Sequence, residues 1–386
     1  MKTKNFGLDL IRATAILLVV VYHSVNLLQP FIDNFFIVGK IAACTQVFGL
    51  LGVEIFFVLS GFLIGGIIID YFTINPVNII GLYSFWGRRW FRTLPQYYII
   101  LVVLFYLNYH QIDSNTHITH FILFFQNFFS PHPIFFAEAW SLSIEEWFYF
   151  LFPILLLLSR LIIYSKKNSQ MEVRIILNVA LCYVIIAFIC KFLYIFLFNN
   201  AIINFDTQIR KVVIMRLDAP MYGVLLAYCF KTKNVIYSKI NKYKHHFFIF
   251  GILGILISLL VIYISDHPSY VHFFDKEVFY IFRNILYFPI LAVFIAITFP
   301  FIICIQPKSK IIKKSINFIS SISYPMYLIH YSLVYLLIFK DLNLETYFMS
   351  LKAFLLYWFI IITLSLALHL IIEKPILRFR DKVLPR

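Results

Sequence analysis

The sequence predicts an all-α, polytopic integral membrane protein with about ten spanning helices and both termini in the cytoplasm. Of its 386 residues, 62% are hydrophobic and only 13% are charged, whereas soluble domains are about 45–50% apolar and about 25% charged. Phenylalanine alone occupies 45 positions. A soluble core does not bury so many apolar side chains, but the hydrocarbon interior of a bilayer accepts them.

The spanning segments are predicted from runs of roughly 20 apolar residues, the length that crosses the hydrocarbon core as a helix. Residues 117–129 form a further apolar run that is too short to cross, so we expect a re-entrant or interfacial segment there. The ten predicted spans are residues 8–28, 47–71, 94–109, 143–164, 174–198, 212–230, 246–264, 278–304, 316–339 and 350–372.

The distribution of Lys and Arg sets the orientation of these spans. With the N-terminus inside, the basic loops at 160–174, 231–244 and 308–314 all face the cytoplasm, and the outer segments are acidic. The net charge of +15 is then explained by orientation and by contact with anionic membrane lipids, not by nucleic acid. We expect one membrane domain over residues 5–375 and a short basic cytoplasmic tail over 376–386.

The five cysteines give no sign of a metal centre or a disulfide framework. They are scattered and lie mostly inside apolar runs, without metal-ligand spacing. We therefore predict no metal site.

The first apolar run is long, and no small-residue cleavage site follows it, so it is expected to remain as a helix.

Ionisable side chains in the first span are candidates for function, because charge is costly inside a bilayer. Arg12 and His23 are eleven positions apart, close to three helical turns, and Asp9 and His23 are close to four. All three therefore project from one face, with Asp9 and Arg12 near the inner end and His23 in the outer half. The structural alternative is an interfacial Asp9–Arg12 pair plus a packing histidine.

Polar groups also occur in the second span and before the third. Glu54 lies in the outer half of the second span, as a functional carboxylate or a structural hydrogen-bond partner. Ahead of the third span, Arg88, Arg89 and Arg92 form a basic stretch. Arg89 and Arg92 share a helix face, and two guanidiniums on one face suit a phosphate. A plain cytoplasmic anchor is the alternative.

The fourth span opens with a cluster of polar residues that follows Trp140. Ser143, Glu145 and Glu146 lie in its first turns. Helix capping by a serine and a glutamate is the structural interpretation. Capping accounts for one glutamate but not for two beside a tryptophan at the membrane, so we include all three residues in the candidate site.

The later spans add further polar residues, and most are expected in the outer half. In the sixth span, Arg216 and Asp218 are candidates for the site, and the structural alternative is that they only neutralise each other. Lys191 of the fifth span is expected to snorkel outward. With His23, Glu54 and Glu145, this group predicts one polar cavity open to the outside above an inner basic site. The added residues are Arg216, Asp218, Arg283, Tyr327 and His330.

Taken together, these motifs resemble the acyltransferase-3 family, whose members are membrane acyltransferases of bacterial surface carbohydrates and of some secreted small molecules. Each motif is weak alone, but the set follows the family's order over about residues 5–375. The motifs are Leu8–Arg12 with His23, Gly52–Ile64, Arg88–Pro95, Trp140–Glu146, Arg216–Gly223, Tyr324–His330 and Glu373–Pro375.

The resemblance implies a donor, an acceptor and a location. The donor substrate is acyl-CoA, usually acetyl-CoA, used from the cytoplasmic side, with no tightly bound cofactor. The acceptor is a sugar hydroxyl, on an O-antigen or exopolysaccharide unit or another lipid-linked glycan. The protein is expected to be a multi-pass protein of the bacterial inner membrane, of the stand-alone type without a further extracytoplasmic domain.

The resemblance also implies roles for particular residues. His23 matches the family's essential histidine, Arg12 its companion arginine, and Glu145 the glutamate of the Trp-Ser-Leu motif. The paired arginines linked to donor binding match Arg89 and Arg92. Two departures are a leucine at position 10, where glycine is frequent, and a glutamate at position 54, where aspartate is commoner. Neither removes a titratable group.

Acyl transfer to a hydroxyl needs a base or a covalent acyl carrier. His23 suits either role because imidazole titrates near neutral pH, and Glu145 or Asp218 would orient it. Arg89 and Arg92 would hold the phosphates of CoA. The alternative is a proton-coupled transporter or flippase of a glycan or small metabolite, which also uses intramembrane charges. The sequence shows no repeated halves of the kind such transporters contain.

Overall fold

The computed structural model describes residues 5–74, 79–107, 117–162, 169–198, 203–232, 235–266 and 276–384. Within these ranges all regular structure is helical, and ten helices are long and apolar enough to cross a membrane. The prediction of an all-α polytopic fold is thereby confirmed. Residues 1–4 and 385–386, which carry the termini predicted to be cytoplasmic, lie outside the described residues.

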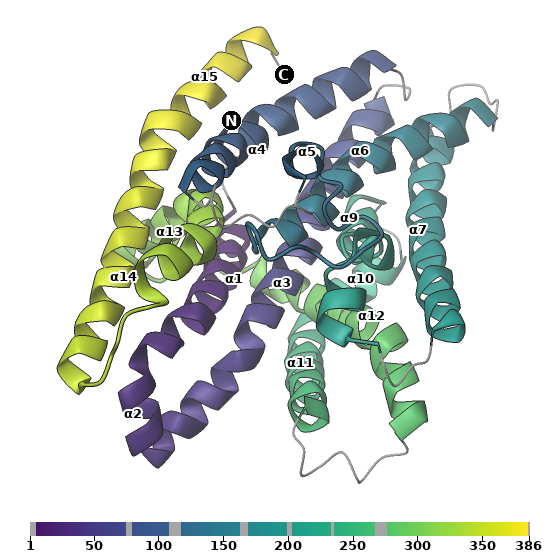
Figure 1. Cartoon of the computed structure of the whole chain (residues 1–386). Coiled ribbons are helices and arrows are strands. Elements are labelled where there is room, and N and C mark those ends of the chain that lie inside the picture. The colour runs from purple at the N-terminus through teal and green to yellow at the C-terminus, as the bar shows by residue number, and fades with distance from the viewer. Residues whose placement is uncertain are drawn as a thin grey trace.

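Figure 1 shows the arrangement of the helices. Among the η segments, η1 is a 3-10 helix and the other three are π-helices. In chain order the elements are α1 (Phe6–Ser24), η1 (Val25–Leu28), α2 (Gln29–Asn34), α3 (Phe36–Ile74), α4 (Ile79–Leu107), α5 (Ile118–Ile122), α6 (Ala139–Ile162), α7 (Ser169–Leu197), η4 (Phe205–Arg210), α8 (Val213–Arg216), α9 (Met221–Thr232), α10 (Val235–Lys242), α11 (Lys244–Asp266), α12 (Lys276–Ile302), α13 (Lys310–Ile329), η6 (His330–Phe339), α14 (Tyr347–Leu368), η7 (His369–Glu373) and α15 (Lys374–Val383).

The third span begins earlier than hydropathy suggested. Its helix α4 starts at Ile79, not near residue 94, so Arg88, Arg89 and Arg92 lie inside the helix. Arginine lowers the mean hydropathy of a window, and the apolar run therefore appears to begin only after the last of them. The early start is what allows these side chains to reach the interior of the bundle.

The short apolar run at residues 117–129 does not form a spanning helix. It contains only α5, followed by turns, and Phe124 there has a φ of 59°. Left-handed backbone is unusual for a bulky residue, and it ends the helical path. The expectation of a non-spanning segment is confirmed.

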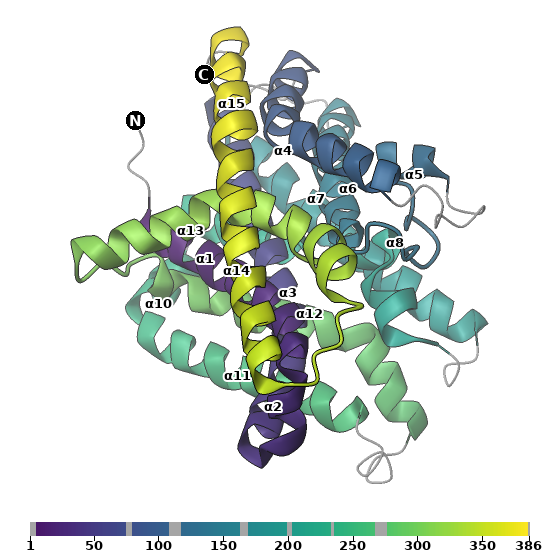
Figure 2. The ribbon, with the colours of Figure 1, turned by 60° about the vertical axis from the view of Figure 1, so that its left-hand side comes forward.

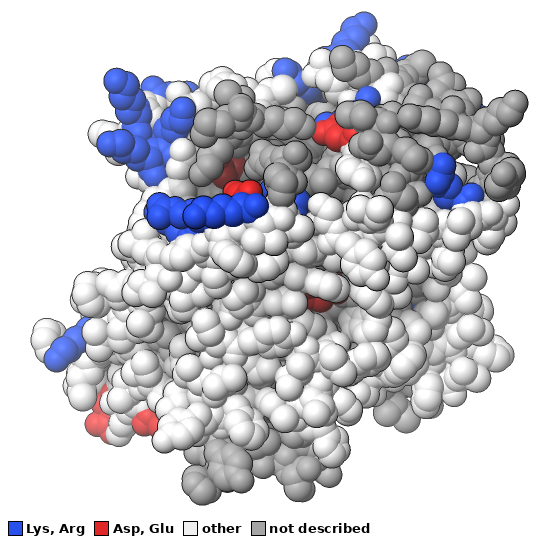
Figure 3. Space-filling view, turned by 90° about the horizontal axis from the view of Figure 1, so that it is seen from above, with Lys and Arg blue, Asp and Glu red and all other residues white. Residues whose placement is uncertain are grey.

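The surface has the character of a protein surrounded by lipid. Large apolar side chains such as Phe36, Ile80, Tyr106 and Phe348 are at least three-quarters exposed. Figure 3 shows Lys and Arg side chains gathered towards one end of the molecule beside a broad band of uncharged surface. This separation is what a bilayer requires.

The helices at the centre of the bundle pack through direct backbone contact. A Cβ added at Gly61 of α3 would lie 1.7 Å from the carbonyl oxygen of Pro220, and one at Gly223 of α9 would lie 2.0 Å from that of Val58. Small residues of this kind let membrane helices approach closely. Helix α1 packs against both α3 and α13, so residues of all three meet in the interior (Figure 2).

The C-terminal part of the chain forms one long helical segment along the side of the bundle, from α14 through η7 to α15 (Figures 1 and 2). The predicted tail over 376–386 is therefore helical as far as Val383. Its Phe379 ring lies 6.0 Å from that of Phe91 in α4, and this contact joins the tail to the helix that carries the arginines.

Candidate active site

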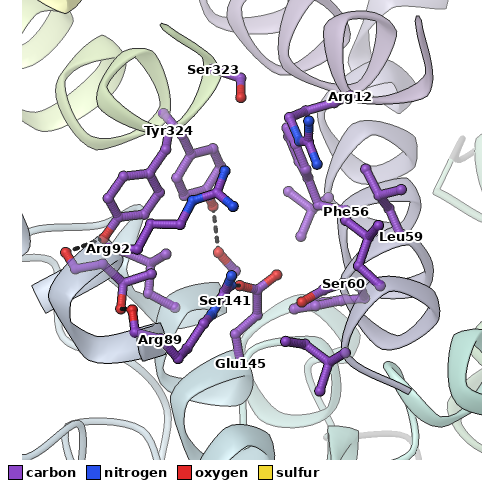
Figure 4. A pocket seen from close by; sticks show the side chains of 17 residues that line it. Arg12, Phe56, Leu59, Ser60, Arg89, Arg92, Ser141, Glu145, Ser323 and Tyr324 are labelled. Carbon is purple, nitrogen blue, oxygen red and sulfur yellow. Dashed lines mark hydrogen bonds and ion pairs between the residues drawn. The ribbon is translucent and has the colours of Figure 1, made fainter. Parts of the chain in front are cut away.

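A cavity of about 100 Å³ lies inside the bundle between α1, α3, α4, α6 and α13. Arg12, Arg89 and Arg92 all line it, and Figure 4 shows their side chains around one space together with Glu145. Three guanidiniums against one carboxylate leave the lining with an excess of positive charge. Its other polar lining residues are Ser60, Thr93, Ser141, Ser323, Tyr324 and Tyr327.

Arg89 is held firmly on one wall of this cavity. Its Nη2 lies 3.6 Å from Glu145 Oε2, and its guanidinium stacks on the Tyr149 ring at 4.1 Å. The same guanidinium donates to the Tyr149 hydroxyl, which in turn donates to Glu145 Oε2 at 2.9 Å. Ser60 Oγ shares a hydrogen bond with that hydroxyl. These contacts fix the guanidinium in place before any ligand arrives.

The other two arginines differ in how far they are neutralised. Arg12 donates to Asp9 Oδ1 at 3.1 Å and to Ser320 Oγ at 3.0 Å, and Ser320 donates to the same aspartate oxygen. Arg92 has no ion-pair or hydrogen-bond partner among the described residues. Arg92 is half-buried, and a guanidinium with no hydrogen-bond or ion-pair partner can bind an anion through two parallel hydrogen bonds, so the geometry favours an anionic ligand there.

Arg88 was predicted with this pair but lies elsewhere. Its guanidinium contacts Asp381 at 3.3 Å and donates to the Leu384 carbonyl, so it connects α4 to α15. Adjacent residues on a helix point about 100° apart, which explains why Arg89 faces the cavity and Arg88 does not.

Two histidines meet on the other side of Tyr327. The rings of His23 and His330 are 5.1 Å apart, and Tyr331 lies 4.1 Å from His23. His330 Nδ1 lies 2.7 Å from the Tyr327 carbonyl oxygen. A carbonyl only accepts, so Nδ1 carries the proton and Nε2 keeps its lone pair. That Nε2 is buried without a partner in the described part of the chain.

Tyr327 separates the arginine cavity from the histidine pair. Its side chain lines the cavity, while its ring lies 5.5 Å from that of His330. Its hydroxyl shares a 2.6 Å hydrogen bond with Ser141 and lies 3.2 Å from the Glu138 carbonyl oxygen. The two groups of polar residues are thus neighbours across one tyrosine.

The predicted single outer cavity is divided in the structure. Glu145, expected beside His23, belongs to the arginine cavity through Arg89. Asp218, the other expected partner of His23, is 3.0 Å from Lys191. Lys191 is itself fully buried, so the expectation that it snorkels outward is wrong.

Glu54 and Arg216 form a second buried ion pair beside Lys191–Asp218. Glu54 Oε2 lies 2.6 Å from Arg216 Nη2, and both side chains are at most 1% exposed. The guanidinium also stacks on Phe288 at 3.8 Å. The pair joins α3 to the segment before α9, so we assign it to packing.

We expect Glu54→Ala to prevent normal folding, because it leaves the Arg216 charge buried and unpaired. Removing one partner of a buried pair costs about 3–5 kcal/mol. The yield and melting temperature of detergent-solubilised protein would fall sharply, and the double variant Glu54→Leu with Arg216→Met would recover much of the loss. A single variant that melts like the wild type would contradict the assignment.

Three remaining predicted residues lie outside the cavity. Ser143 accepts a 2.6 Å hydrogen bond from Gln126 of the non-spanning segment. Glu146 is buried against Thr93 of α4. Arg283 stacks on Phe205 at 4.9 Å. Each connects segments of the bundle around the candidate site.

Glu138, immediately before α6, is a buried carboxyl that the sequence interpretation missed. It is 5% exposed and accepts from the Ser332 amide at 3.1 and 3.2 Å and from the Ser332 hydroxyl. Tyr149 was also missed, although its position four residues after Glu145 places both on one helix face. For Glu138, the signal was an acidic residue two positions before Trp140.

Burial raises the pKa of Glu138 from an ordinary 4.5 to about 7, and the hydrogen bonds from Ser332 offset only part of that rise. The folded state therefore binds this proton more tightly than the unfolded state. This proton contributes roughly 3 kcal/mol to the free energy of unfolding. The contribution is fully present below about pH 4.5 and is lost as the pH rises through about 7.

Thermal unfolding in detergent between pH 4.5 and 8 tests this dependence. The melting temperature of the wild type should fall over that interval, and Glu138→Gln, which has no titrating proton, should flatten the fall. Equal slopes for the two proteins would show that Glu138 does not titrate there.

Comparison with known proteins finds relatives that are named as acyltransferases. Curated relatives include "Peptidoglycan O-acetyltransferase OatA" of Listeria monocytogenes, 33% identical over 153 residues, which cover 34% of this chain and 23% of OatA. "Putative O-acetyltransferase SACOL0978" of Staphylococcus aureus is 27% identical over 374 residues, 86% of this chain and 53% of that protein. The chain thus spans about half the length of these relatives or less.

No solved structure matches the chain. The sequence model of Acyl_transf_3, described as an acyltransferase domain, matches residues 5–374. The match includes the three cavity arginines, the histidine pair and Tyr327 between them. The chain therefore belongs to the acyltransferase-3 family.

Proposed function

We propose that the protein transfers an acyl group, most simply acetyl, from cytoplasmic acyl-CoA to a hydroxyl of an extracytoplasmic or lipid-linked carbohydrate. The observation that supports this most directly is the unpaired Arg92 in a cavity that Tyr327 separates from the His23–His330 pair. The family membership and the O-acetyltransferase names of the relatives support the reaction class.

The arginine cavity supplies the donor site. Phosphate groups of CoA carry several negative charges, and guanidiniums bind them with paired hydrogen bonds. Arg89 is already oriented by Tyr149 and Glu145, so a phosphate there costs little reordering. Arg92 provides a guanidinium that no hydrogen bond or ion pair occupies among the described residues. Glu145 thus serves as a positioning group for Arg89 in this proposal.

The histidine pair supplies the transfer site. Arg12 and His23 belong to the same helix α1, and eleven residues at 1.5 Å each place them about 16 Å apart along its axis. A donor held by its phosphates near Arg12 therefore needs an extended arm to bring its thioester to His23. The pantetheine arm of CoA is of this kind.

His23 accepts the proton of the acceptor hydroxyl in this proposal. The hydroxyl oxygen forms a bond to the thioester carbonyl carbon, and its O–H proton passes to the imidazole. The carbon–sulfur bond then breaks, and the proton returns to the departing thiolate to give free CoA. Atoms and charge balance with no further reactant.

Labelled acetyl-CoA supplied to inside-out vesicles that contain the protein tests the proposal. Alkali-labile label should appear on O-antigen, exopolysaccharide or peptidoglycan material enclosed with them, and right-side-out vesicles given the same donor should show none. Movement of a glycan across the membrane without any labelling would support the transporter alternative and overturn the proposal.

A further inference from the structure

The turn before α6 and the π-helix η6 are joined by an unusual pair of side chains. Glu138 and Ser332 are 194 positions apart, and both carboxylate oxygens of Glu138 accept from the Ser332 amide. The Ser332 hydroxyl donates to the same carboxylate and accepts from the Ala137 amide at 3.0 Å. We call this set of hydrogen bonds the Glu138–Ser332 clasp.

The clasp changes the backbone that carries His330. In an uninterrupted α-helix the Ser332 amide would donate its hydrogen bond to the carbonyl four residues earlier. Here it donates to the Glu138 carboxylate. Helix α13 ends at Ile329, and the ten-residue π-helix η6 begins at His330. π-Helical segments are rare, and most are single turns, so a π-helix of ten residues that begins at His330 is an exceptional feature of this backbone.

The turn that delivers Glu138 is itself strained. Phe136, two residues earlier, has a φ of 49°, a left-handed conformation that bulky residues rarely adopt. Its ring is buried and stacks on Tyr97 at 5.4 Å. Strain of this kind persists only where surrounding contacts over-determine the geometry.

Hydrogen bonds fix both the backbone and the side chain of His330. The Tyr357 hydroxyl donates to the His330 carbonyl at 3.1 Å, while the imidazole Nδ1 donates to the Tyr327 carbonyl. With the clasp two residues further on, these contacts hold the His330 ring 5.1 Å from that of His23, and its Nε2 has no partner in the described part of the chain. The Glu138 carboxylate has no described contact with Arg89 or Arg92, and only the backbone carbonyl of Glu138 meets the cavity lining, at the hydroxyls of Tyr327 and Ser141.

We propose that Glu138 is a positioning residue that, through Ser332, holds His330 in the register and tautomer that serve the His23 site. The inference rests on the proposed acyl transfer at that site. Glu138 touches neither substrate nor the reacting atoms. It acts by replacing one helical hydrogen bond, so that η6 starts at His330 and its imidazole faces His23.

Steady-state kinetics of Glu138→Ala, Glu138→Gln and Ser332→Ala in vesicles test the proposal. Glu138→Ala should lower kcat roughly 10- to 100-fold, the effect of misplacing a reacting group by about 1 Å, with KM for acetyl-CoA unchanged. Glu138→Gln should restore most of kcat because its amide oxygen accepts from the Ser332 amide. The double variant Glu138→Ala with Ser332→Ala should be no worse than Glu138→Ala alone.

A second measurement does not depend on turnover. Nitrogen-15 NMR of labelled histidine, with the His330 signal assigned from His330→Asn, should show one Nδ1–H tautomer in wild type and Glu138→Gln and a mixture in Glu138→Ala. Wild-type kcat or an unchanged tautomer in Glu138→Ala would overturn the proposal. Absence of acyl transfer in the wild type would instead overturn the proposed function, while the tautomer measurement still decides the role of Glu138.

Discussion

Replacement of His23 by alanine should lower kcat for acyl transfer by roughly 10²–10⁴-fold, the contribution of a positioned general base. His23 lies 5.1 Å from His330 and 4.1 Å from Tyr331, ring to ring. Without the imidazole, the acceptor hydroxyl must lose its proton to water, so the barrier to attack on the thioester rises.

The effect on kcat is measured in membrane vesicles at matched protein level with saturating acetyl-CoA and acceptor. His120→Ala is the matched control, because it removes an exposed histidine of the non-spanning segment and should transfer acyl groups like the wild type. Full acyl transfer by His23→Ala at normal protein level would exclude His23 as the base.

The second large effect is expected at Arg92. Arg92→Ala should raise KM for acetyl-CoA about 10- to 100-fold, because hydrogen bonds to charged groups each contribute about 1.5–3 kcal/mol. At saturating donor, kcat should stay near the wild-type value, since the histidine pair is untouched. The mechanism is loss of the one cavity guanidinium that has no partner among the described residues.

Arg88→Ala is the matched control for Arg92→Ala. It removes the same charge from the same helix, but its guanidinium contacts α15 and not the cavity, so its KM for acetyl-CoA should stay near the wild-type value. Acetyl-pantetheine, which has the thioester arm but no phosphate, should be used equally poorly by Arg92→Ala and the wild type. A larger KM effect in Arg88→Ala than in Arg92→Ala would misplace the donor site.

The fold was predictable because hydropathy and helix length are local properties. Apolar runs located the ten candidate spans among the described residues, and the run that was too short does not form a spanning helix. The predicted start of α4 was wrong because arginines inside a helix lower the mean hydropathy of a window as much as a polar loop does. Nothing in that window reveals that neighbouring helices bury those guanidiniums.

The sequence predicted which residues lie near the candidate site better than it predicted which of them form ion pairs with one another. Helical spacing placed Arg89 and Arg92 on one face and brought Asp9 beside Arg12, as the structure shows. It did not identify Lys191 as the partner of Asp218, because that contact depends on how α7 rotates against its neighbours. The clasp of Glu138 depends on residues from two distant segments, and one sequence contains no record of such contacts.

The connection between α4 and α15 decides where an affinity tag can be attached. The carbonyl of Leu384 accepts a hydrogen bond from Arg88, whose neighbour Arg89 lines the cavity. A rigid fusion placed close behind α15 would crowd the contact between Arg88 and the Leu384 carbonyl. A flexible Gly/Ser spacer decouples the two, and kinetic constants from tagged protein are best compared with those after the tag is removed.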